Sequence, residues 1–180
     1  MATKLIQAVS AENGFSALMG EANTWSEVTG CAFYKITWDT SKGMVLDADG
    51  KLREGDVRIS VCPPFEIFPE NIAIEDIDKQ PSIMHAKVLG TEDVFRIWGK
   101  RVQGRTLNVF SFENADVLGG FGYHATAPKM VSEAREDAVL VIEKYELPTE
   151  EHPDGRLVIV AGDTLVHDGP PVSYTHLRAH

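Results

Sequence analysis

The sequence predicts an α+β fold in which an antiparallel β-sheet, arranged as a meander, packs against a few helices. Apolar side chains recur at helical spacing over the first thirty residues. From Cys31 onward, short segments rich in β-branched and aromatic residues are separated by turn sequences, which is typical of strands. No internal repeat at the spacing of a solenoid is present.

Two helices are expected at the N-terminus and a third near the middle of the chain. Asn13-Gly14 interrupts the first apolar pattern, so two helices should meet near residue 13, and Gly30 should end the second. A short helix is expected at 91–98, because acidic residues occupy its first turn and Gly99 follows it.

Strands are expected in several segments that alternate in polarity or are rich in β-formers. Pro63-Pro64 should end one of them and place an irregular apolar plug at the sheet edge. The stretch 113–137 has no period and contains a glycine-rich run, which predicts an inserted loop. The expected strands are 31–38, 56–62, 82–88, 139–147, 156–161 and 165–167, and the expected buried side chains are Trp25, Phe33, Ile59, Val61, Phe95 and Trp98.

Composition limits the classes of function. The 180 residues carry a formal net charge of −10, which argues against general nucleic-acid binding and against docking on an anionic membrane. No apolar run approaches the roughly 20 residues that a membrane span needs, and the start lacks a secretory signal pattern. Cys31 and Cys62 cannot form a disulfide framework or a four-cysteine zinc site, so we expect a soluble protein made in a reducing cytoplasm.

Residues 66–78 contain five acidic side chains and no basic one. Their spacing does not match a calcium-binding loop, so the pattern favours a solvated acidic loop over a metal site.

No motif for catalysis, a metal or a cofactor is present. The histidines show no spacing that would bring two ligands to one face, and there is no nucleophile elbow and no phosphate-binding loop. His85, His124, His152 and Cys62 are therefore not expected to converge, and we expect no enzyme, no metal and no cofactor. The less favoured alternative is a hydrolase or transferase that uses His85 or His124 with a nearby acid.

Four segments, taken in order, resemble the portal protein of tailed bacteriophages, the ring at the capsid vertex through which DNA is packaged. They are WSEVTGCAFYKITWD (25–39), GDVRISVCPPFEIFPEN (55–71), SIMHAKVLGTEDVFRIWGK (82–100) and VIEKYELPTEEHPDGRLVIVAGDTLVHDGP (141–170). The residues that carry the likeness are Trp25, Gly30, Lys35, Trp38, Asp39, Pro64, Phe65, Pro69, Trp98, Gly155 and Arg156.

The resemblance implies a structural virion protein, part of the head–tail connector. The full-length subunit would form a homo-oligomeric ring, a dodecamer in the family, at the capsid portal vertex and would be assembled in the bacterial host cytoplasm. Its partners would be the terminase, capsid and tail-connector proteins. Double-stranded DNA would pass through the channel without sequence-specific binding, and no membrane would be involved.

Portal subunits are longer than this chain, so residues 1–170 are expected to be a wing-like α+β domain from a partial chain. Residues 171–180 are similar to translated adapter sequence found at the ends of metagenomic reads, so we treat them as a non-native tail, and His176 and His180 carry no functional weight. A small β-rich binding module, whose acidic surface selects a basic partner, is the other alternative.

Overall fold

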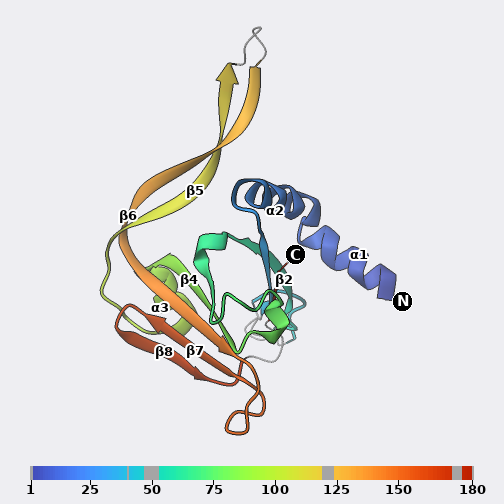
Figure 1. The fold of residues 1–180 in the computed structure, drawn as a ribbon. Helices are drawn as coiled ribbons and strands as arrows, with labels where there is room; N and C mark the ends of the chain where they lie inside the picture. The colour runs from blue at the N-terminus through green and yellow to red at the C-terminus, as the bar shows by residue number, and fades with distance from the viewer. Residues whose placement is uncertain (1, 40, 47–52, 119–123, 172–175, 180) are drawn as a thin grey trace. The chain divides into compact units, whose positions relative to one another are not determined.

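The computed structural model describes residues 2–39, 41–46, 53–118, 124–171 and 176–179. The chain has the mixed α+β fold that the sequence predicts, with antiparallel strand pairs and helices (Figure 1). It divides into two compact units: Met1–His85, Lys144–Leu157 and Asp168–His180 form the first, and Ala86–Glu143 and Val158–His167 form the second. Within the described ranges, no helix is both long and apolar enough to span a membrane.

Two N-terminal helices belong to the first unit, as predicted. Helix α1 spans Ala2–Glu12 and α2 spans Phe15–Thr29. Gly14 lies between them with a left-handed backbone (φ 59°, ψ 40°) that glycine adopts without steric cost. Gly30 also adopts this conformation, and its N–H donates to the carbonyl oxygen of Ser26, which confirms the predicted end of α2.

The side chain of Asn13 joins this helix corner to the neighbouring sheet. Its Nδ2 donates to the carbonyl oxygens of Val9 and Val57, each at 2.9 Å. Its Oδ1 accepts a hydrogen bond of 2.9 Å from the backbone N–H of Ile59. One amide therefore fixes the end of α1 against the strand that contains residues 57 and 59.

That strand, β2 (Asp56–Cys62), pairs antiparallel with β1 (Phe33–Asp39), from Phe33↔Cys62 to Asp39↔Asp56. Strand β9 (His176–Ala179) pairs antiparallel with the other side of β1, so the order in this sheet is β2-β1-β9. The sequence pattern did not predict β9, which lies in the segment expected to be a non-native tail. The expected origin of that segment stays a prediction.

After the two prolines the chain forms the expected plug at a sheet edge. A 3₁₀ turn, η1 (Pro64–Glu66), leads into the short strand β3 (Ile67–Pro69), and a second 3₁₀ turn, η2 (Ile77–Lys79), follows. Strand β3 pairs antiparallel with β4 (Ser82–Gly90) and ends the strand order β3-β4-β6-β7-β8. Cys62, Ile67 and Ile83 form a buried cluster beneath it.

The second unit is built around helix α3 (Thr91–Trp98), which ends at the left-handed Gly99 as predicted. Strands β6 (His124–Glu146), β7 (Arg156–Ala161) and β8 (Thr164–Gly169) each contribute part of their length to this unit. Glu143 is buried and forms an ion pair of 2.8 Å with Lys87. Among the residues of this unit whose side chains are described, the buried apolar ones are Val94, Ala138, Val139, Val141, Ile159 and Ala161.

The prediction of an inserted loop near 113–137 is wrong. Strand β5 (Arg105–Leu118) pairs antiparallel with β6 from Leu107↔Arg135 to Leu118↔His124, with a register shift between Arg105 and Leu107 (Figure 1). Residues 132–137 are exposed. Neither face of the strand is buried at these residues, so the sequence needs no alternation of apolar and polar side chains. The periodicity that would indicate a strand is therefore absent. Residues 119–123 lie outside the described part.

The expected core is only partly confirmed. Trp25 is 3% exposed, and its ring meets that of Phe65 edge-on at 5.5 Å between centroids. Phe95 is 46% exposed, so its predicted burial is wrong. Val94 is the residue of α3 that enters the core, and Phe95 instead lies under the guanidinium of Arg101. The half-buried residues among those expected in the core are Phe33, Ile59, Val61 and Trp98.

We expect Trp25→Ala to destabilise the chain by about 3–5 kcal/mol, because it removes a large buried ring and leaves a cavity. Leu5→Ala is the control, since Leu5 is 66% exposed, and it should change stability by less than about 0.5 kcal/mol. Denaturant titration followed by far-UV circular dichroism measures both. Equal effects would contradict the assignment of Trp25 to the core.

Candidate functional site

A hollow of about 250 Å³ lies in the first unit, where the end of β6, the following turn and the start of β7 meet η2. Its walls combine apolar side chains with a few polar ones. The lining residues are Ile77, Asp78, Gln80, Ile83, Tyr145, Glu146, Leu147, Pro148, Asp154, Gly155, Arg156 and Pro171.

The turn that closes this hollow depends on Gly155. Its φ of 78° lies in the left-handed region, and a Cβ atom there would be 2.8 Å from the carbonyl oxygen of Glu146. The N–H of Gly155 donates to the carbonyl oxygen of His152 at 2.9 Å, and the N–H of His152 donates to Thr149 Oγ1 at 3.1 Å. The turn therefore holds the next residue, Arg156, at the start of β7.

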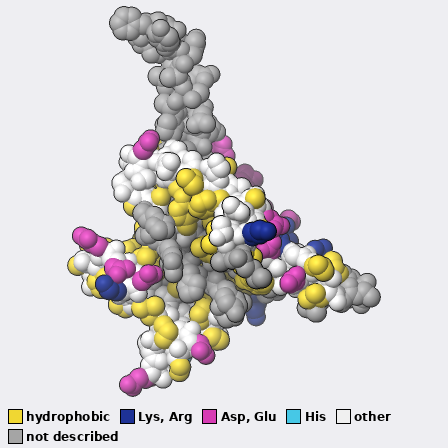
Figure 2. Space-filling view, turned by 90° about the vertical axis from the view of Figure 1, so that its right-hand side faces the viewer, with side chains coloured by type: hydrophobic (Ala, Val, Ile, Leu, Met, Phe, Trp, Pro, Cys, Tyr) yellow, Lys and Arg dark blue, Asp and Glu magenta, His cyan; other side chains and the backbone are white. Residues whose placement is uncertain are grey.

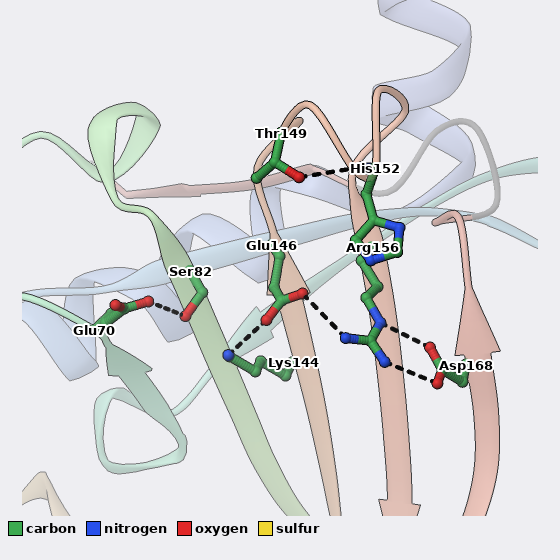
Figure 3. A network of polar contacts seen from close by, with 8 residues as sticks. All are labelled: Glu70, Ser82, Lys144, Glu146, Thr149, His152, Arg156 and Asp168. Carbon is green, nitrogen blue, oxygen red and sulfur yellow. Dashed lines mark hydrogen bonds and ion pairs between the residues drawn. The ribbon is translucent and has the colours of Figure 1, made fainter.

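Arg156 is the centre of a polar network on three neighbouring strands (Figure 3). Its Nε and Nη2 donate to the two carboxylate oxygens of Asp168 at 2.8 and 2.9 Å. This bidentate arrangement matches the planar guanidinium to the carboxylate. Nη1 lies 3.9 Å from Oε2 of Glu146, whose Oε1 accepts a bond of 2.6 Å from Lys144. The network therefore ties β6, β7 and β8 together.

The electrostatics of the network follow from these pairs. The hydrogen bond from Lys144, together with the charges of Lys144 and Arg156, lowers the pKa of Glu146 below its ordinary value. The hydrogen bond to Asp168 raises the pKa of Arg156 further. Both partners therefore stay ionised near neutral pH.

A second polar contact lies at the edge of the same unit. Ser82 at the start of β4 donates a hydrogen bond of 2.6 Å to Oε2 of Glu70, which follows β3 (Figure 3). Glu70 belongs to the acidic segment expected to be a solvated loop, so part of that segment has a partner on the sheet.

Glu66 also departs from the solvated loop that was expected. It is the partly exposed end of a row of three titratable groups, called the buried row because Lys35 and His85 are buried. Lys35 Nζ lies 3.2 Å from His85 Nδ1, and His85 Nε2 lies 3.1 Å from Glu66 Oε2. Since an ammonium group can only donate, Nδ1 accepts from it and Nε2 carries the proton that is donated to Glu66. The row joins β1, β4 and η1.

The predicted chemical residues do not form one cluster. His85 lies in the buried row, His152 lies in the turn before Arg156, and Cys62 lies in the apolar cluster with Ile67 and Ile83. The side chain of His124 lies outside the described part. Among the residues that the structure describes, no three His, Cys, Asp or Glu side chains are placed to hold a metal ion. The expectation of no catalytic function stays a prediction.

The first residues that carry the portal resemblance are placed at separate points of the first unit. Trp25 contacts Phe65, Gly30 ends α2, and Lys35 is in the buried row. Trp38 is 38% exposed, and Asp39 accepts hydrogen bonds from the N–H and hydroxyl of Ser41, which lower its pKa.

The remaining residues of that set are also spread out. Pro64 begins η1, Pro69 ends β3, and Trp98 ends α3. The structure brings Gly155 and Arg156 to the hollow, and these two alone from the set line it.

Sequence reasoning missed the partners of Arg156. Lys144 and Glu146 are two residues apart on a strand, so their side chains share a face. Asp168 comes opposite the start of β7 because the chain reverses at Gly162-Asp163, and the length of that turn fixes the hairpin register. Both signals are present in the sequence.

No protein-family model and no curated protein sequence matches the chain. The portal resemblance is therefore carried by the four sequence segments given above.

We expect Gly155→Ala to destabilise the chain by about 1–3 kcal/mol, because alanine is strained at this φ and its Cβ meets a backbone oxygen. Gly20→Ala is the matched control: Gly20 lies within α2 with open space around it, so the same change should stabilise by about 0.5–1 kcal/mol. Thermal denaturation of both variants is the measurement. Stabilisation by both would contradict the strained turn.

We expect Glu146 to stabilise the fold only when it is ionised. Because its pKa is lower in the folded chain than in the unfolded chain, its contribution is complete above the ordinary value of about 4.5 and is lost as pH falls through the lowered pKa. Glu146→Gln should thus cost stability at neutral pH, and the difference from the unmodified chain should shrink below about pH 4.5. Urea titrations over a pH series measure this, with Glu150→Gln at an exposed position as the control that should leave stability nearly unchanged.

Proposed function

We propose that the chain is a structural assembly protein, a wing-like part of a phage portal subunit whose copies form a ring at the capsid vertex. The observation that carries the proposal is the exposure of large apolar side chains on α1 and α2. Leu5 and Ile6 are 66% and 65% exposed, and Val28 and Met19 are 52% and 46% exposed. Apolar side chains exposed at several positions of these two helices support a surface that another protein covers.

The face drawn in Figure 2 supports the same interpretation. Several groups of hydrophobic side chains are exposed on it, and acidic side chains are exposed there as well. Apolar groups set among charges are typical of interfaces that keep a subunit soluble before it assembles.

The polar clusters favour a structural role over the hydrolase alternative. Both ring nitrogens of His85 are engaged, by Lys35 and Glu66, and the residue is 4% exposed. Arg156, Asp168, Glu146 and Lys144 are engaged with one another. These groups link strands, and substrate would have to displace an existing partner to reach them. The net charge of −10 also suits a protein past which DNA slides.

We expect the full chain to form oligomers in solution, and Leu5→Glu with Ile6→Glu to reduce them, because charges at exposed apolar positions oppose burial. Size-exclusion chromatography with light scattering gives the mass, and negative-stain microscopy shows whether the oligomers are closed rings. Met44→Glu is the control, since Met44 is 71% exposed but lies outside both helices. A chain that stays monomeric at every concentration tested would overturn the proposal and favour the binding module.

A further inference from the structure

A loop of the first unit is held rigidly by one buried glutamine. Gln80 is 2% exposed. Its Oε1 accepts a hydrogen bond of 3.0 Å from the N–H of Asn71, and its Nε2 donates to the carbonyl oxygens of Asn71 and Ile74, each at 2.7 Å. The Oδ1 of Asn71 in turn accepts from the N–H of Ala73 at 2.9 Å. The backbone from residue 71 to residue 74 is therefore fixed at both ends.

This fixed loop presents an apolar side chain to solvent. Ile72 is 90% exposed, the highest value among the large apolar residues of the described part. Glu75 and Asp78 follow it and are also exposed. Ordering a loop costs conformational entropy, and Ile72 adds nothing to the core of its own chain. A preorganised loop that carries an exposed apolar side chain has the properties of a binding element.

The end of α3 in the second unit has the opposite charge. Phe95 and Ile97 are 46% and 56% exposed, and residues 94–112 include four basic side chains and no acidic one. The guanidinium of Arg101 lies 4.8 Å from the centroid of the Phe95 ring, a cation–π contact. A hollow beside the helix is lined by Thr91, Glu92, Phe95, Arg101 and Val102.

We propose that Ile72 of one copy enters the hollow beside α3 of the next copy, while Glu75 and Asp78 face Lys100 and Arg101. On one surface exposed apolar groups accompany the acidic segment 66–78, and on the other they accompany the basic segment 94–112, while Lys79 and Glu92 carry the minority charge of each surface. The prevailing charges are opposite, so a second copy of this chain is the occupant that both surfaces fit. The contact joins two different surfaces, which produces a head-to-tail arrangement that can close into a ring. The inference rests on the proposed function, and it identifies the contact by which neighbouring copies would join in the ring.

Charge reversal tests this contact directly. We expect Glu75→Lys with Asp78→Lys, and separately Lys100→Glu with Arg101→Glu, to weaken self-association by about tenfold or more, because each places like charges opposite one another. The chain with all four substitutions should regain association, since the pairs are restored with the signs exchanged. Sedimentation equilibrium at low ionic strength measures the association constants. Glu150→Lys with Glu151→Lys is the control. It changes the net charge as much as Glu75→Lys with Asp78→Lys, but at another exposed turn, and should have little effect on self-association.

The apolar part of the contact has its own test. Ile72→Asp should weaken association to a similar degree, whereas Met44→Asp, at another highly exposed apolar position, should not. Circular dichroism shows whether each variant is folded. If the fourfold variant regains self-association, the charge reversals have not unfolded the chain.

The outcomes separate this inference from the proposed function. Oligomers that form normally in all the variants would overturn the contact and leave the assembly role standing. A monomeric unmodified chain would overturn both. A third outcome concerns DNA. If a random-sequence duplex binds the unmodified chain, and Lys100→Glu with Arg101→Glu abolishes that binding without changing self-association, the basic surface is assigned to nucleic acid and the contact is overturned.

Discussion

An ammonium group removed from water must find partners, and Lys35 in the middle of β1 is only 6% exposed. Its Nζ is placed against His85 of β4 and lies 5.4 Å from the centroid of the Tyr145 ring on β6. His85 can accept from Lys35 only if its other nitrogen donates, and Glu66 of η1 supplies that acceptor. Within the first unit, one buried amino group thus links β1 to His85, Tyr145 and, through the histidine, Glu66, and a charged Lys35 selects the histidine tautomer that donates to Glu66. The plug after Pro63-Pro64 follows from this, since Glu66 holds it to the sheet.

The helices and most strands could be predicted because their signals are local. Helical spacing, the Asn13-Gly14 break and the alternation in 156–161 each act over a few residues, and the structure has α1, α2 and β7 where they indicate. The β5–β6 ribbon was missed because a strand that is exposed, as residues 132–137 are, needs no periodicity of apolar residues. The row of Lys35, His85 and Glu66 was missed for a different reason. Lys35, His85 and Glu66 are far apart in sequence, and only the pairing of the strands brings them together. Phe95 was assigned to the core on its apolar character, which does not distinguish a core residue from an interface residue.

The polar and apolar features of the molecule have separate locations. Titratable groups such as Arg156 and Asp168 pair with one another across neighbouring strands, so their chemistry is used to hold the sheet. Large apolar side chains such as Leu5 and Ile72 remain exposed, where they stabilise nothing in the isolated chain. Arg156 and Asp168 are partly accessible to solvent, but each already holds a partner of opposite charge. This distribution is the physical reason that we favour assembly as the function.

The bonds of Asn13 have a consequence for aggregation. Strand β2 is at one end of its sheet, and a strand in that position offers unpaired N–H and C=O groups on which another chain can add a strand. Asn13 donates to the carbonyl of Val57 and accepts from the N–H of Ile59, as an adjoining strand would. The amide side chain therefore occupies the position where an incoming strand would begin to pair. Asn13 therefore opposes strand addition over residues 57–59 of this edge, as the devices that protect edge strands do.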